Sequence, residues 1–235
     1  MWVDLFLCLL LAHLIADFAL QTSKSCKSKR EKKWCSGWHY IHAAMVFVLS
    51  WLASFHLGFW WCALVIAVSH FAIDIWKSYR EENVKWFVVD QVFHIAILGV
   101  VAWRWLGYNE WIAPFGIGTK YIALLVAIIV CWKPANIFIK LMLKYYSVNV
   151  PDAHTDTGFN AGALIGDIER WLILAFVIMQ RYEALGLLIA AKSIIRFGDK
   201  ETAKTEYVLA GTLMSIFIAV LAGLMVSKFM VKAVL

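Results

Sequence analysis

The chain is poor in charged residues and has no long polar segment. Asp, Glu, Lys and Arg together make up 16% of its 235 residues. The longest polar stretches, 22–38 and 147–160, are short enough to be loops. This scarcity excludes a separate soluble domain. We expect a single membrane domain over residues 1–235, with a first half at 1–106 and a second half at 119–235.

The sequence also lacks a paired-cysteine pattern and a secretory signal. Its five cysteines are scattered and none belongs to a CxxC pair, so no disulfide framework is expected. A secretory signal begins with basic residues and ends at a small-residue cleavage site. This chain begins MWVDLFLCLLLAHLIADFAL, with Asp4 and no such site. We therefore expect the first apolar helix to be retained.

What the chain does contain is apolar sequence. Hydrophobic residues make up 63% of it and the mean hydropathy is +0.73, whereas soluble domains are about 45–50% apolar. A helix needs about 20 apolar residues to cross a bilayer. Eight segments approach this length: 2–21, 39–57, 59–76, 86–106, 119–146, 161–180, 184–198 and 206–228. The seventh is short, and Pro134 can kink the fifth. We predict an all-α, polytopic integral membrane protein with seven or eight transmembrane helices.

Lysine and arginine are concentrated in alternate connections between these segments. The connection after the first segment is the most basic, with Lys24, Lys27, Lys29, Arg30, Lys32 and Lys33. Because the basic side of a membrane protein faces the cytoplasm, we expect both termini of an eight-span protein to be extracytoplasmic. The same bias explains the net charge of +6, so no nucleic-acid partner is expected.

Histidine and aspartate recur at four-residue spacing within three apolar segments. The pairs are His13 and Asp17, His70 and Asp74, and Asp90 and His94, and the second segment opens with His39 and His42. Four-residue spacing places two side chains on one face of a helix. The predicted orientation brings all of them within about two turns of the cytoplasmic face. We therefore expect four helices to present these groups at one depth.

Imidazole and carboxylate groups together suit zinc, manganese or iron, and a pair at i, i+4 offers two ligands to one ion. We predict a divalent-metal site, with zinc or manganese favoured and enough ligands for two ions. The expected ligands are His13, Asp17, His42, His70, Asp74, Asp90 and His94. The carboxylates Asp17, Asp74 and Asp90 are also the candidates for a catalytic general base. His42 is favoured over His39 because it lies deeper in its segment.

Further charged groups near the same face predict a phosphate-bearing substrate, because basic side chains bind phosphate. The substrate-binding candidates are Lys77, Glu169, Arg170, Lys192 and Arg196. Groups expected to hydrogen-bond around the site are Gln21, Gln91, His39 and Glu206. Charges at this depth cost about 2–3 kcal/mol each unless paired or hydrated. Pairing of Glu169 and Arg170 with neighbouring helices is therefore the alternative interpretation.

Six blocks in order resemble the domain-of-unknown-function 3307 family of bacterial integral membrane proteins. They are HLIADFALQ, HFAIDIWKS, VDQVFH, GALIGDIERWLIL, AAKSIIRF and EYVLAGTLMS. The resemblance implies a membrane fold and supports the choice of polar residues, but it implies no activity. The family pattern has a single histidine early in the second segment, where this chain has both His39 and His42.

Three functions fit these patterns. The favoured one is a metal-dependent hydrolase or phosphotransferase acting on a phosphoester with an apolar part, such as a phospholipid or a polyprenyl phosphate, at the cytoplasmic leaflet. The second is a proton- or metal-coupled transporter that uses the same cluster. The third is a non-enzymatic membrane partner whose basic segment 22–38 docks a cytoplasmic protein or anionic lipid. Membrane lipids and a phosphate-bearing substrate are the expected partners, and a homo-oligomer is compatible with the sequence. Mutual hydrogen bonds that hold helices together are the structural alternative for each His/Asp pair.

Overall fold

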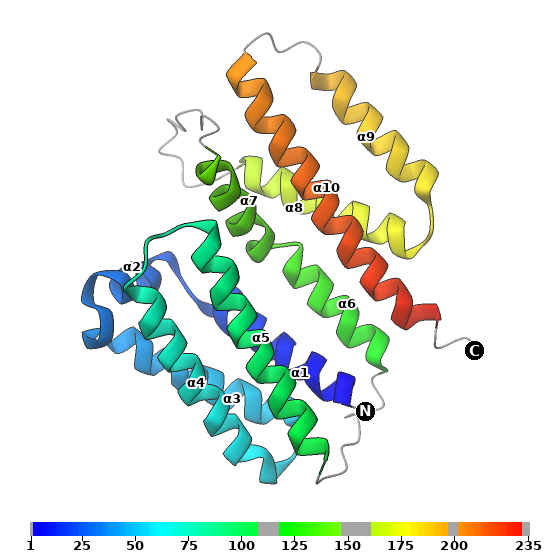
Figure 1. Cartoon of the computed structure of the whole chain (residues 1–235). Coiled ribbons are helices and arrows are strands. Elements are labelled where there is room, and N and C mark those ends of the chain that lie inside the picture. Colours follow the sequence, from blue (N-terminus) through cyan, green and yellow to red (C-terminus); the bar gives the residue numbers. More distant parts are fainter. Residues whose placement is uncertain (1, 108–117, 147–160, 197–201, 232–235) are drawn as a thin grey trace. The chain divides into compact units, whose positions relative to one another are not determined.

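The computed structural model describes residues 2–107, 118–146, 161–196 and 202–231, and this part of the chain is helical with no strand (Figure 1). The all-α class predicted from the sequence is confirmed. The chain divides into two compact units, Met1–Val126 and Ala127–Leu235. Their boundary lies within helix α6, and each unit is described by itself.

Four helices of the first unit close into a ring of contacts. They are α1 (Trp2–Leu14), α3 (Gly37–Ser54), α4 (Trp60–Ser78) and α5 (Val84–Leu106). Helix α1 contacts α3 and α5, α3 contacts α4, and α4 contacts α5. Short 3₁₀ turns at Lys33–Cys35 and Leu57–Phe59 precede α3 and α4. The result is a four-helix bundle with an enclosed interior.

The interior of this bundle changes character along its length. At one end the buried side chains are apolar and include Leu5, Leu9, Val46, Ile66 and Leu98. Toward the other end, where α1 leads into α2 and α4 turns into α5, the buried side chains are histidines and carboxylates. The pairs at four-residue spacing therefore line one end of the bundle interior.

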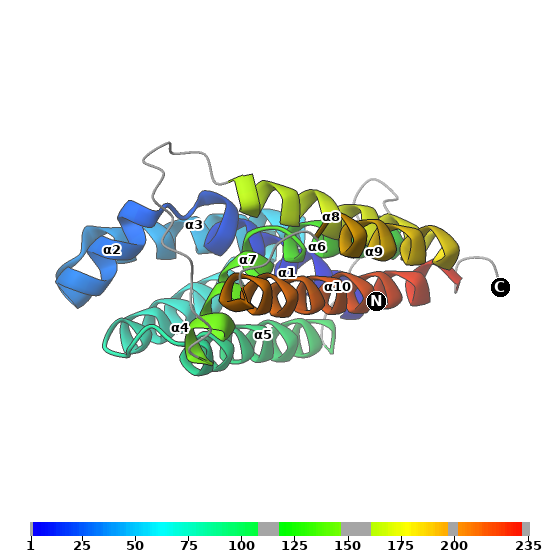
Figure 2. The ribbon, with the colours of Figure 1, turned by 90° about the horizontal axis from the view of Figure 1, so that it is seen from above.

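Segment 22–38 was predicted as a loop, and this is wrong for its first half. Residues Ser23–Lys32 form helix α2, at the end of the first unit where α4 also ends (Figure 2). A reciprocal cap starts the helix, because the Thr22 hydroxyl accepts from the Ser25 backbone N–H at 3.2 Å and Ser25 Oγ accepts from the Thr22 N–H at 3.1 Å. Apolar residues do not recur at helical spacing in this segment, so the capping residues Thr22 and Ser25 were its only sequence signal of a helix.

The first helix changes its winding before it ends. Residues Ile15–Leu20 form a π-helix that continues directly from α1. A π-helical turn holds an extra residue, and such turns occur frequently at functional sites. Asp17 lies in this segment. The wider turn therefore determines where its carboxylate points.

The second unit is also helical. It contains α7 (Lys133–Tyr145), α8 (Ala161–Ile178), α9 (Tyr182–Arg196) and α10 (Thr202–Val231). Helix α10 packs on α7 and α8, and α8 contacts α9. A Cβ on Gly223 would lie 2.6 Å from Val177 Cγ1, so glycine is required where α10 crosses α8.

The predicted fifth segment is interrupted. Helix α6 (Thr119–Val130) ends before Cys131, and α7 begins at Lys133 with Pro134 in its first turn. Proline suits the first turn of a helix, where its missing N–H needs no partner. The break expected near Pro134 is confirmed.

Five segments are long and apolar enough to cross a membrane: Trp2–Leu20, Leu57–Ser78, Val84–Leu106, Thr119–Tyr145 and Val208–Met230. Their outward faces expose large apolar side chains such as Val68, Val92 and Phe217. Apolar exposure on this scale is typical of a surface covered by another apolar phase. The other three predicted segments coincide with α3, α8 and α9, which fall outside this set. The total of seven or eight spans therefore stays a prediction.

Candidate metal centre

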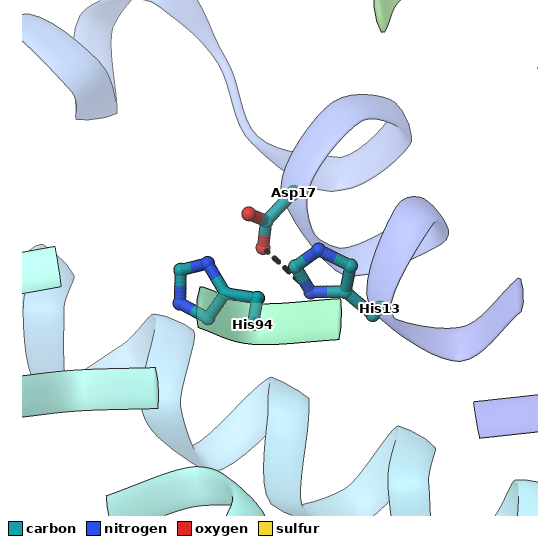
Figure 3. Close-up of side chains that lie close together, drawn as sticks. All are labelled: His13, Asp17 and His94. Atoms are coloured by element: carbon teal, nitrogen blue, oxygen red, sulfur yellow. Dashed lines mark ion pairs between the residues drawn. The ribbon is translucent and has the colours of Figure 1, made fainter. Parts of the chain in front are cut away.

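Six potential metal ligands from four helical segments meet inside the first unit. They are His13, Asp17, His42, His70, Asp74 and His94. They form three groups of three, namely His13–Asp17–His94, Asp17–His42–His70 and His70–Asp74–His94, and the ligand atoms within each group lie within 4.8 Å of one another. Figure 3 shows the first group, with the Asp17 carboxylate gathered beside the rings of His13 and His94. Shared members link the three groups into one cluster.

The closest contacts in the cluster form a triangle. Asp17 Oδ1 lies 3.1 Å from Nε2 of His42 and 3.1 Å from Nε2 of His70. The two Nε2 atoms lie 2.8 Å apart. Each Nε2 carries at most one proton. If both histidines donate their Nε2 proton to the Asp17 carboxylate, the two N–H groups face each other. If instead one Nε2 accepts a hydrogen bond from the other, the lone pair of the accepting nitrogen also faces the carboxylate. With Asp17 ionised, hydrogen bonds alone therefore leave one side of the triangle repulsive.

A metal ion fits this donor set. Nitrogen and oxygen ligands lie about 2.0–2.1 Å from zinc, which separates tetrahedral ligands by about 3.3 Å. The sides of the triangle, 2.8–3.1 Å, are slightly shorter than this. A cation that takes a lone pair from each of the three atoms removes this repulsion while Asp17 stays ionised.

A hydrogen-bond chain fixes the His13 ring from behind. Lys77 Nζ donates to Asp90 Oδ2 at 2.5 Å, and Gln91 Nε2 donates to the same oxygen at 2.9 Å. This orients the amide so that Gln91 Oε1 accepts from His13 Nε2 at 3.4 Å. Consequently His13 Nδ1 keeps its lone pair on the side of Asp17, whose Oδ1 is 3.8 Å away. Such outer contacts are what orient a metal-binding histidine.

His94 is buried without the partners that its ring requires. Neither of its nitrogens has a hydrogen-bond partner among the described residues, and its side chain is 3% exposed. Buried polar atoms without a partner are rare in native proteins. The nearest carboxylate oxygen is Asp90 Oδ1, 3.7 Å from Nδ1. The ring thus has lone-pair capacity available for an ion.

Asp90 lies behind the ligand atoms rather than among them. It belongs to none of the three groups in the described part of the chain. Its carboxylate is fully buried, and Oδ2 is occupied by Lys77 and Gln91. The geometry therefore favours a role for Asp90 in orienting Gln91, and through it His13, over its expected role as a ligand.

Lys29 also contacts the cluster, although its sequence position did not predict this. Its Nζ donates to Asp74 Oδ2 at 2.6 Å, and its side chain is 8% exposed. With its amide oxygen turned toward Lys29, Gln21 accepts from Nζ at 2.7 Å and donates to the Asp17 carbonyl at 3.2 Å. The lysine escaped notice because its segment was assigned to a loop. In helix α2 it follows buried Ser25 by one turn, which directs it inward.

Asp17 differs from Asp74 and Asp90 in having no lysine partner among the described residues. Lys29 neutralises Asp74 and Lys77 neutralises Asp90, whereas the ion-pair partners of Asp17 among the described residues are histidines. A buried carboxylate requires a compensating charge. A protonated histidine or a metal cation beside Asp17 would supply one.

The structure distinguishes between His39 and His42, the two histidines of α3 that are candidates for one ligand position. His42 belongs to the triangle, whereas His39 belongs to none of the three groups. The His39 ring is buried and packs edge-on against Phe71, with centroids 6.2 Å apart. The structure therefore favours His42 as the ligand.

Arg170 forms a closed network within the second unit. Its guanidinium donates to the Cys131 carbonyl at 2.6 Å, to Ser215 Oγ at 3.0 Å, to Asn136 Oδ1 at 2.6 Å and to Asp167 Oδ1 at 2.5 Å. The residue is 2% exposed. This arrangement favours the alternative that Arg170 pairs with neighbouring helices, because little of its hydrogen-bonding capacity is left for phosphate.

The other charged candidates of the second unit are Glu169, Lys192, Arg196 and Glu206. Two of them pair with each other, and the side chains of the other two are not described. Lys192 donates to Glu169, which joins α9 to α8. Arg196 and Glu206 lie in α9 and α10, but their side chains fall outside the described part of the structure. Their expected role with a substrate stays a prediction.

Residues 5–115 match the model of the family described as Protein of unknown function (DUF3307). This confirms the resemblance noted in the sequence. The matched segment contains all six residues of the cluster, together with Lys29, Lys77, Asp90 and Gln91. No curated protein and no solved structure matches the chain.

Proposed function

We propose that this chain binds a divalent metal ion, zinc or manganese, in the His/Asp cluster and uses it to hydrolyse or transfer a phosphoester. The observation that carries the proposal is the triangle of Asp17, His42 and His70. Its three ligand atoms approach one another within 3.1 Å in a way that protons alone do not satisfy while Asp17 is ionised. The unpartnered ring of His94 supports the same conclusion.

The site lies, in this proposal, at the cytoplasmic leaflet of a bacterial inner membrane. Five apolar helices support insertion. The cluster occupies the end of the bundle that carries basic helix α2 and the α4–α5 connection, and basic connections face the cytoplasm. Seven or eight spans and extracytoplasmic termini belong to the same proposal. Phospholipid and polyprenyl phosphates have their phosphate groups at this depth, which is why they are the favoured substrates.

Asp17 is the central ligand because, of the three residues that two groups share, Asp17, His70 and His94, it is the carboxylate. One carboxylate can therefore serve two ions, with His42 and His70 on one side and His13 and His94 on the other. A divalent ion held there would polarise a phosphoryl oxygen and activate a water molecule for attack.

The surrounding residues have distinct tasks. Gln91 fixes the His13 tautomer, and Asp90 holds the Gln91 amide in place. Asp74 is the most exposed of the three carboxylates, at 11% against 8% for Asp17 and 0% for Asp90. It is therefore our candidate to accept a proton from the attacking water. The half-exposed Lys77 is the candidate contact for the substrate phosphate.

The test is hydrolysis by the purified full-length protein. Phosphatidic acid and a polyprenyl phosphate are supplied in micelles with zinc or manganese, and released phosphate is measured. We expect metal-dependent release that His42→Ala abolishes. His56→Ala is the matched control, since His56 lies at the opposite end of the bundle and caps the Leu57–Phe59 turn. Equal activity of the wild type with and without a chelator, or of His42→Ala and the wild type, would refute the proposal.

A further inference from the structure

Helix α2 has two unlike faces. The face toward α3 and α4 buries Ser25 and Lys29, and Lys29 reaches Asp74 inside the bundle. The opposite face is exposed and basic, with Lys24, Lys27, Arg30 and Lys32. Tertiary packing therefore uses one charged residue of this helix and leaves the others facing outward.

The exposed charge continues around the end of the bundle. Lys33 follows α2, and Arg80 and Lys85 flank the α4–α5 connection. Among the described residues, two of these exposed basic side chains have an ion-pair partner, Lys27 with Glu31 at 3.8 Å and Arg30 with Glu82 at 2.5 Å. We call the remaining exposed residues the basic collar: Lys24, Lys32, Lys33, Arg80 and Lys85. None of these five forms an ion pair within the described part of the chain.

Exposed aromatic rings lie within the collar. Trp34 is 61% exposed, Trp38 44% and Tyr79 54%. Lys33 Nζ lies 4.4 Å above the Tyr79 ring, and the Arg80 guanidinium lies 4.7 Å from the Trp86 ring. Tryptophan and tyrosine are enriched at the level of lipid headgroups, where one part of the ring is apolar and another is polar.

We propose that the basic collar binds the headgroups of anionic phospholipids. Two observations favour a lipid surface over an acidic soluble protein. First, unpaired cations and exposed indoles occur together, which matches a negatively charged headgroup layer above an apolar interior. Second, the collar lies at the ends of α4 and α5, whose outward faces are apolar and long enough to span a bilayer.

The collar is connected to the candidate metal centre through one helix. Lys29 holds Asp74 from the inner face of α2 while the outer face binds headgroups. Anionic lipids are thereby concentrated beside the cluster. The binding itself does not depend on the proposed hydrolysis, because none of the collar residues is a ligand candidate.

Native mass spectrometry of the full-length protein in neutral detergent tests this proposal by counting bound lipids during titration. We expect phosphatidylglycerol to bind more tightly than phosphatidylcholine. The variant K24Q/K32Q/K33Q removes three collar charges. Since each basic residue near an anionic surface contributes about 1 kcal/mol, we expect a loss of about five-fold per lysine, or about 100-fold in total. The control K120Q/R181Q/K228Q removes equal charge elsewhere and should leave binding nearly unchanged.

Three outcomes would overturn the proposal. These are equal affinity for the two lipids, unchanged phosphatidylglycerol binding in the collar variant, and inorganic phosphate competing as strongly as the intact lipid. The metal content is measured on the same samples. We expect the collar variant to keep its metal, so a failure of lipid binding is distinguishable from a failure of the metal site.

Discussion

Replacing Asp17 with Asn is the mildest change that removes charge from the centre of the cluster. Asn keeps the size of the side chain and one oxygen that can accept from His42 or His70. If hydrogen bonds alone hold the helices together, the variant loses little, because such bonds between membrane helices contribute about 0.6–2 kcal/mol. The protein would then remain folded and otherwise unchanged.

If the cluster binds a metal ion, the same change is far more damaging. Loss of an outer-sphere partner weakens metal binding by about 10–100-fold. Asp17 is a direct ligand candidate in two groups and the one cluster carboxylate with no lysine partner. We therefore expect zinc or manganese affinity to fall by more than about 100-fold, equivalent to about 2.8 kcal/mol.

Isothermal titration of metal into chelator-treated protein measures this loss. Asp4→Asn, the same exchange near the start of α1, is the control and should bind as the wild type does. Binding by Asp17→Asn within about threefold of the wild type, a difference below 1 kcal/mol, would refute the reasoning. The cluster would then be explained by hydrogen bonding between helices.

Three further changes probe the surrounding residues. Gln91→Ala frees the His13 tautomer and should weaken metal binding by about 10–100-fold in the same titration; unchanged affinity would contradict the role assigned to Gln91. Lys29→Met leaves Asp74 without its cation and should destabilise the protein by about 3 kcal/mol; a thermal unfolding midpoint equal to that of the wild type would argue against the buried pair. Arg170→Met breaks the network of the second unit and should cost about 3–5 kcal/mol, while metal affinity stays the same; a parallel loss of metal would show that the network serves the site.

The sequence was most informative where a periodic pattern reports directly on structure. The i, i+4 pairs His13–Asp17 and His70–Asp74 share helix faces, so their inward orientation followed from spacing alone. Apolar length predicted the helical class. The break in the fifth segment followed from Pro134, whose ring removes a donor and disfavours the preceding helical turn.

Two features of the site had no such signal. Helix α2 is held by its cap and by packing of a few small residues, so its polar sequence resembled a loop and Lys29 was overlooked. The residues IADFAL give no local signal for the π-helix at Ile15–Leu20. Its wider turn aims Asp17 at both His42 and His70.

The role of Asp90 shows a different limit. Spacing correctly predicted that it shares a face with His94, but spacing does not distinguish a ligand from a residue behind a ligand. That distinction depends on Lys77, which is thirteen residues away and binds Asp90 Oδ2 across the α4–α5 turn. Pairing of Glu169 with Lys192 likewise depends on how α8 packs against α9.

The metal content of the purified protein tests the central claim most directly. Elemental analysis is performed on the wild type, on His94→Ala and on His56→Ala after identical purification and dialysis against zinc or manganese. We predict at least one ion per chain in the wild type and in His56→Ala, and a large loss in His94→Ala. A metal-free wild type that also fails to rebind zinc or manganese would contradict the account.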